Sequence, residues 1–428
     1  MRRILPLLLA ALALPAAVLA VPYSITYTDG AGEGFNDATA VGSTTLGQQR
    51  KDVLVYALDY WTSRLSGSQT IQVEASFDPL GGTAGSALLA QASPTQFVFL
   101  AAGGPRTNTF YPIGMANQIN SIDNGIGIAD IEVQFNTDVD NATVLGNVNW
   151  YYGLDENAGT HVSMVRTALH ELGHGFGFLD CINSGDGTFL GDPFPCIYDT
   201  YLRQGSGPGT ALTSLGAGAR ATALTSDNIF WEAGTNVATS FGGQPRMYAP
   251  NPYEPGSSVS HFREATFTPE ELMEPVLSTD FLAVGLTDDA FKDMGYALTG
   301  PTVLPEVAFT VSPGSIVAEN AGVQNFTVTR TGDTSEAVSF NISLSGTASA
   351  GVDYSLSQSS FSIGIGATTA SFTITPVADG VDEGPVGLSG ETVVVAISRV
   401  LKAGYGTNNT ISFNLNDSAA DVHDWSMF

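Results

Sequence analysis

The chain has 428 residues, of which 43% are hydrophobic and 10% aromatic, so its length suits two or three domains with substantial apolar cores. Its 42 acidic residues against 15 basic ones give a formal net charge of −27. A surface of this sign repels nucleic-acid phosphates and anionic lipid, which argues against both as partners, whereas clustered carboxylates are suited to binding divalent cations.

The first 20 residues have the form of a secretory signal peptide. Arg2 and Arg3 precede an apolar run, and Val18-Leu19-Ala20 offers a small-residue cleavage site. The alternative is a membrane anchor, for which this apolar run is short. No later run reaches about 18 apolar residues, so we expect a secreted protein without a membrane span.

Residues 21–298 mix helix and strand signals and predict an α+β domain. Residues 45–65 carry apolar side chains at helical spacing and end before Gly67. Residues 71–77 alternate as a half-buried strand does, and residues 97–102 and 130–135 are further strand candidates.

A second helix is predicted over about 163–176, and it carries the main chemical signal. His170 and His174 are four residues apart, so they share one helix face and can bind a single Zn²⁺. Glu171 lies beside the first histidine and can take a proton from a metal-bound water. The alternative is an ordinary helix with surface histidines, but the segment is otherwise apolar and would place them poorly without a metal.

The third zinc ligand has two candidates. Gly177, three residues after His174, can end the helix in a left-handed turn. Asp180 follows it by three residues, and His261 stands twelve residues before Met273. Spacing alone leaves both open; a family resemblance carried by the segments around these residues favours His261, with Asp180 as the alternative.

These two segments resemble the metzincin zinc metallopeptidases. The pattern His-Glu-x-x-His-x-x-Gly at 170–177 is similar to that superfamily's helix motif, and VSHFREATFTPEELMEP at 259–275 resembles the leishmanolysin group, in which an insertion precedes the third histidine. The edge segments GEGFND (32–37) and KDMGYAL (292–298) resemble bacterial secreted relatives more weakly. The resemblance implies Met273 as the turn methionine under the metal, and there is no room here for the long propeptide of many such enzymes.

The implied reaction is peptide-bond hydrolysis with a polypeptide as substrate. Zn²⁺ would lower the pKa of its water toward about 7, and Glu171 would act as general base and then return the proton to the leaving amine. An exposed edge strand would hold the substrate by β-pairing, and residues 130–135 are the candidate for it.

The chain has only two cysteines, Cys181 and Cys196, and both follow the predicted metal helix closely. Export permits a disulfide, which would close a short loop. The alternative is a pair of buried free thiols.

After a Pro- and Gly-containing linker at 299–306, residues 307–417 carry only strand signals separated by turns, which predicts an all-β sandwich. Residues 418–428 are expected to form a tail. The sandwich segment resembles a Calx-beta domain through VAENAGVQNFTVTRTG, GTASAGVDY and VADGVDEG. That resemblance implies Ca²⁺ bound at one end by five loop carboxylates, namely Glu319, Asp353, Asp379, Glu383 and Asp417.

Ala378, Gly380 and Ser418 stand where this family commonly has acidic residues, so we expect a calcium site that is weaker or binds fewer ions. A sandwich with solvated acidic loops is the alternative. For the whole chain, the leading hypothesis is a secreted zinc endopeptidase with a calcium-binding module. The rival is a non-catalytic, calcium-dependent adhesion or matrix protein on a metallopeptidase scaffold, which would have no need of Glu171.

Overall fold

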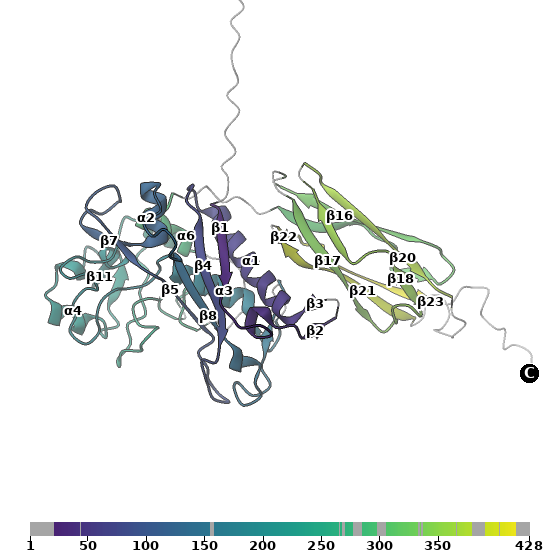
Figure 1. Cartoon of the computed structure of the whole chain (residues 1–428), viewed down its shortest axis with the longest axis horizontal. Coiled ribbons are helices and arrows are strands. Elements are labelled where there is room, and N and C mark those ends of the chain that lie inside the picture. Colours follow the sequence, from purple (N-terminus) through teal and green to yellow (C-terminus); the bar gives the residue numbers. More distant parts are fainter. Residues whose placement is uncertain are drawn as a thin grey trace, which may run out of the picture.

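The structure is a computed structural model, and it shows a mixed α/β part followed by a part made only of strands (Figure 1). The predicted signal peptide, most of the predicted linker and the predicted tail lie outside the residues that it describes. Those residues are 21–42, 44–154, 158–264, 266–267, 270–276, 285–297, 305–332, 334, 337–364, 366–378, 390–401 and 403–416.

The α/β part is built on a four-stranded sheet in the order β1-β4-β8-β5. Strands β1, β4 and β8 are parallel to one another, and β5 pairs antiparallel with β8. The bounds of these strands are β1 Tyr23–Tyr27, β4 Ile71–Asp78, β8 Ile131–Asn136 and β5 Ala90–Pro94. The prediction that residues 130–135 form the exposed edge is therefore wrong, because β8 is bonded on both sides and β5 is the edge strand next to it.

Smaller strands and helices complete this part. The helices are α1 Leu46–Arg64, α2 Ile113–Asn120, α3 Met164–Phe176, α4 Ala217–Ala223, α5 Asn236–Phe241 and α6 Thr287–Met294. The short strands are β2 Ala40–Val41, β3 Thr44–Thr45, β6 Phe97–Leu100, β7 Thr109–Pro112, β9 Trp150–Tyr151, β10 Val162–Ser163, β11 Leu202–Gln204, β12 Thr210–Ala211 and β13 Ile229–Trp231.

Helix α1 confirms the predicted helix at 45–65. It begins where the Thr45 hydroxyl accepts a hydrogen bond from the Gln48 N–H. Its apolar stripe is buried, and Trp61 in its last turn is fully buried and donates from Nε1 to the Leu169 carbonyl of α3 at 3.0 Å. This bond and the contact of the Trp61 ring with Phe176 fix α1 against α3.

Three glycines explain how α3 packs so tightly. A Cβ at Gly173 would lie 2.8 Å from Met273 Sδ, and a Cβ at Gly175 would lie 2.5 Å from Cγ2 of Ile131 in β8. Gly177 has a φ of +121°, which ends the helix. The low helix propensity of the two helical glycines is offset by packing, because they let β8 and the segment around Met273 approach the helix backbone.

The C-terminal part is a sandwich of two five-stranded sheets. Their orders are β18-β20-β16-β14-β22 and β15-β23-β21-β17-β19, and the two share one apolar core in which Phe326 and Phe372 stack at 4.8 Å. The strands are β14 Glu306–Val311, β15 Ile316–Ala318, β16 Gln324–Thr331, β17 Val338–Gly346, β18 Tyr354–Leu356, β19 Ser360–Ile363, β20 Thr369–Pro376, β21 Glu391–Leu401, β22 Gly404–Tyr405 and β23 Thr410–Asn416. This is the all-β architecture expected for the segment.

Within the described part of the chain, no helix combines the length and the apolar character that crossing a membrane requires.

Close packing at Gly175 makes a direct prediction. Gly175→Ala should destabilise the protein by about 1 kcal/mol, because overpacking against Ile131 costs about 1–3 kcal/mol and exceeds the helix-propensity gain of about 1 kcal/mol. The matched control is Gly218→Ala in α4, where a Cβ meets nothing within 4 Å and only the propensity gain remains. Urea denaturation of both variants checks this, and a stabilised Gly175→Ala would contradict the packing argument.

Candidate metal centre

Two of the three clustered histidines come from α3. His170 and His174 lie one turn apart on the same face, and their Nε2 atoms are 3.2 Å from each other. Both side chains are buried. The helix that carries them is capped at its start by Ser163, whose hydroxyl accepts from the Arg166 N–H.

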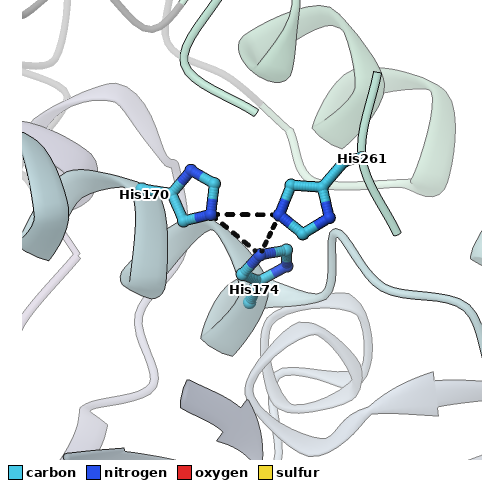
Figure 2. A group of neighbouring side chains, drawn as sticks. All are labelled: His170, His174 and His261. Atoms are coloured by element: carbon cyan, nitrogen blue, oxygen red, sulfur yellow. Dashed lines mark hydrogen bonds between the residues drawn. The ribbon is translucent and has the colours of Figure 1, made fainter. Parts of the chain in front are cut away.

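The third histidine arrives from a segment far along the chain. His261 Nε2 lies 3.1 Å from Nε2 of His170 and 3.1 Å from Nε2 of His174, so the three nitrogens form a nearly equilateral triangle (Figure 2). His261 is also buried. Of the two candidates for a third ligand, the structure brings His261 to the pair.

Each imidazole is oriented by a main-chain carbonyl oxygen. Nδ1 of His170 is 2.8 Å from the Leu272 carbonyl, Nδ1 of His174 is 2.7 Å from that of Phe178, and Nδ1 of His261 is 2.8 Å from that of Ser257. A carbonyl oxygen can only accept, so each Nδ1 carries the proton and each Nε2 directs a lone pair at the centre of the triangle.

This donor set fits Zn²⁺. A tetrahedral zinc site with zinc–nitrogen distances of about 2.0–2.1 Å holds its nitrogens about 3.3 Å apart, close to the separations seen here. Burial, together with the neighbouring histidine, lowers the pKa of His170 to about 3, and burial lowers that of His174 to about 4. The rings of His170 and His174 are therefore unprotonated at neutral pH. The lone pairs that face one another repel, and a bound dication would relieve that repulsion.

Met273 packs against the helix that carries two of the histidines. Its side chain is fully buried against Gly173 of α3, and its carbonyl accepts from the Phe262 N–H at 2.8 Å. Leu272, whose carbonyl orients His170, is the adjacent residue. The segment 271–274 thus packs on α3 and fixes one ring of the cluster.

Glu171 follows His170 in α3, and its side chain is buried. Burial raises the pKa of its carboxyl to about 8, and the main-chain N–H of Ala92 donates to it. Ala92 belongs to β5, so the edge strand passes directly beside this carboxylate. A group with this pKa exchanges a proton readily near neutral pH, as a general base does.

Asp180 lies outside the triangle and serves a different group. Its carboxylate accepts from the Ser260 hydroxyl at 2.6 Å, and its main-chain N–H donates to the same hydroxyl at 3.0 Å. Among the described residues, two separate groups of side chains lie close enough together to hold a metal ion. One is the three histidines, and the other is Cys181, Cys196 and Asp199.

That second group is accounted for by a disulfide. Cys181 and Cys196 are bonded to each other, as predicted, with their Cα atoms 6.0 Å apart. The Asp199 carboxylate accepts from the main-chain N–H of both cysteines at 3.1 Å. Burial raises the pKa of Asp199 to about 8, with the nearby Asp180 charge adding to it.

Of the five predicted calcium ligands, the structure describes Glu319 and Asp353. Glu319 follows β15 and is buried, and its N–H donates to the Asn416 carbonyl at the end of β23. Asp353 precedes β18 and is buried, and its carbonyl accepts from the Val377 N–H after β20. Figure 1 shows β18, β20 and β23 toward the same end of the sandwich. Asp379, Glu383 and Asp417 lie outside the described residues.

Two features of the site had no clear sequence signal. The edge strand β5 has the weakly alternating sequence AQASP, which does not stand out as a strand, and only its pairing with β8 reveals it. Ser260 was visible as the neighbour of His261, but its partner Asp180 lies 80 residues earlier. The other histidine described, His161, is exposed and accepts from the Asn149 N–H, as an ordinary surface residue does.

No protein-family model and no curated protein matches this chain. Among solved structures, the apo form of the Calx CBD1 domain is similar over 27% of this chain and 98% of its own, with 24% identity and a TM-score of 0.24. The calcium-binding domain pair CBD12 of CALX1.1 is 25% identical over 26% of this chain and 44% of its own, with a TM-score of 0.23. The periplasmic chaperone SfaE is 13% identical over 26% of this chain, with a TM-score of 0.20.

The raised pKa of Glu171 predicts a pH-dependent stability in the zinc-free protein. Its folded pKa of about 8 exceeds its ordinary value of 4.5, so folding takes up a proton between these two values and the carboxyl's contribution falls as the pH rises. Glu171→Gln removes that loss. The free energy of unfolding of the variant, relative to that of the wild type, should therefore rise by at most about 1.4 kcal/mol per pH unit from about pH 5 to 8. Urea denaturation in chelator measures this, and a constant difference across that range would contradict it.

Proposed function

We propose that the protein is a secreted, zinc-dependent endopeptidase. The observation that carries the proposal is the buried triangle of three imidazole Nε2 atoms, 3.1–3.2 Å apart. Glu171, the residue after His170, is buried on the same helix. The three neutral nitrogens leave a fourth position for water or substrate, which is the ligand count of catalytic rather than structural zinc sites.

In this proposal His170, His174 and His261 hold the ion. Bound Zn²⁺ supplies a Lewis acid that polarises the scissile carbonyl and lowers the pKa of a water to about 7. Glu171 would accept one proton of that water as the water oxygen bonds to the scissile carbonyl carbon, and would return it to the leaving nitrogen as the C–N bond breaks, which gives a carboxylic acid and an amine. Burial raises the pKa of the Glu171 carboxyl, which favours its taking up a proton.

The edge strand β5 supplies a means of holding an extended polypeptide. Leu89 C=O accepts from the Asn136 N–H, and Thr95 N–H donates to Asp130 C=O, so the odd-numbered residues point their main-chain groups toward β8. The groups of Ala90 and Ala92 then point to the open side, as the bond from Ala92 to Glu171 requires. A substrate paired there would pass directly over the proposed base.

The resemblance of 170–177 and 259–275 to the metzincins, and to the leishmanolysin group in particular, supports the same assignment. The burial of Met273 against α3 and the helix end at Gly177 are consistent with what this resemblance implies. Secretion rests on the signal-like residues 1–20 and is consistent with the Cys181–Cys196 disulfide, which is rare in the cytosol.

We further propose that the sandwich binds Ca²⁺. The support is the Calx-beta-like sequence together with two buried carboxylates, Glu319 and Asp353, that follow or precede strands at one end of the fold. Hydrogen bonds link Glu319 to Asn416 and Asp353 to Val377. These bonds hold Asn416 and Val377 next to the described carboxylates, and the proposed ligands Asp417 and Asp379 follow them in the sequence by one and two residues.

Glu171→Gln tests the enzymatic proposal. The variant should retain zinc while its rate of casein hydrolysis falls about 10²–10⁴-fold, because the amide cannot accept the proton. His161→Ala is the matched control, since this histidine is exposed and outside the cluster. Unchanged hydrolysis in Glu171→Gln would refute the proposed mechanism, and a wild type that binds zinc without cleaving any polypeptide would favour the adhesion protein.

Calcium should raise the melting temperature of the sandwich in the full chain. A ligand that binds only the folded state stabilises it by about 2.7 kcal/mol at a hundredfold excess over its dissociation constant. Asp353→Asn should shrink the shift, because it removes a charge while keeping an oxygen for the Ser349 N–H. Calorimetry in millimolar calcium, in magnesium and in chelator measures the effect. A melting temperature that does not change with calcium would contradict the calcium site and favour a sandwich with solvated acidic loops.

A further inference from the structure

The segment that delivers His261 is held in an unfavourable conformation. Val259, two residues before the histidine, has a φ of +69°, which is rare for a β-branched residue. Its side chain is fully buried. Such a conformation persists only where surrounding contacts over-determine it, so the neighbours of residues 257–261 decide where the third histidine stands.

Those contacts come from the chain that follows α3. The Asp180 carboxylate accepts from the Ser260 hydroxyl at 2.6 Å, while the Asp180 N–H donates to the same oxygen at 3.0 Å. The Tyr198 hydroxyl donates to the Val259 carbonyl at 2.9 Å. The Cys181–Cys196 disulfide and Asp199, which accepts from both cysteine N–H groups, fix the loop between these two contacts.

The helix exit contacts one histidine directly and the neighbour of a second. The Phe178 carbonyl orients His174, and Asp180, two residues later, bonds to Ser260, the residue next to His261. A short turn at Gly177 separates both groups from the end of α3. The two hydrogen bonds between Asp180 and Ser260 thus link the end of α3 to His261, alongside the main-chain bonds of residues 257–262 to Tyr248, Glu254 and Met273.

We propose that Asp180 is a positioning residue, which acts through Ser260 to place His261 Nε2 at the metal. Asp180 is the alternative candidate for the third ligand, and here it instead holds the loop that brings His261 to the cluster. The inference rests on the proposed zinc function, because its effect is measured as zinc affinity.

The experiment is a double-mutant cycle on the full chain with zinc affinity as the readout, measured by competition with a chromophoric chelator. Ser260→Ala and Asp180→Ala should each weaken zinc binding about 10–100-fold, as loss of a group that orients a ligand does. Since both changes remove the same contact, the double variant should be no weaker than Ser260→Ala alone. Asp180→Asn keeps an oxygen for the Ser260 hydroxyl and should restore most of the affinity.

Ser258→Ala is the control. Ser258 is buried in the same segment, but its hydroxyl accepts from the Glu254 N–H and does not contact Asp180. Its zinc affinity should stay within about threefold of the wild type, even if the zinc-free melting temperature falls. That melting temperature, recorded for every variant, separates loss of folding from loss of positioning.

Wild-type affinity in Ser260→Ala, or independent losses that multiply in the double variant, would overturn the positioning role. Failure of the proposed zinc function has a different signature, because the wild type would then bind no zinc or His261→Ala would bind it as tightly as the wild type. The two results are read from the same titrations.

Discussion

The site depends on three hydrogen bonds from imidazole Nδ1 atoms to main-chain carbonyls. Because Phe178, Leu272 and Ser257 each contribute one carbonyl, every ring is held by backbone rather than by a mobile side chain. The bonds fix the tautomer of each ring and send the three lone pairs to one point. Any change that moves one of these carbonyls moves a nitrogen by a similar amount, so the histidine cluster inherits the rigidity of the surrounding backbone.

That backbone is rigid because close packing and glycine allow three layers to meet at α3. Gly175 lets β8 approach one side of the helix, and Gly173 lets Met273 approach another. Trp61 of α1 covers the helix and binds its Leu169 carbonyl. The helix is thus enclosed by close packing, which also explains why Glu171 is buried enough to have a raised pKa.

Buried carboxylates serve as structural acceptors elsewhere in this acidic chain. Asp293 of α6 accepts from Trp231 Nε1 and from the main-chain N–H groups of Asn236 and Val237, and so joins α6 to the start of α5. Asp199 does the same for the two cysteines. In both places one carboxylate satisfies several donors that would otherwise be buried without a partner. Asp180 belongs to this group by its chemistry, although its contact lies one residue from the metal cluster.

The sequence by itself determined the local elements and the local chemistry. Helical spacing predicted α1 and α3, the alternation of residues 71–77 predicted β4, and the pair His170 and His174 was visible because a helix brings residues four apart to one face. Tertiary structure decided whatever depends on residues distant in sequence. It selected His261 over Asp180 for the cluster, since only packing brings a nitrogen across 87 positions. It also made β5 rather than β8 the edge strand, because strand order is set by which faces bury together and not by the residues of either strand.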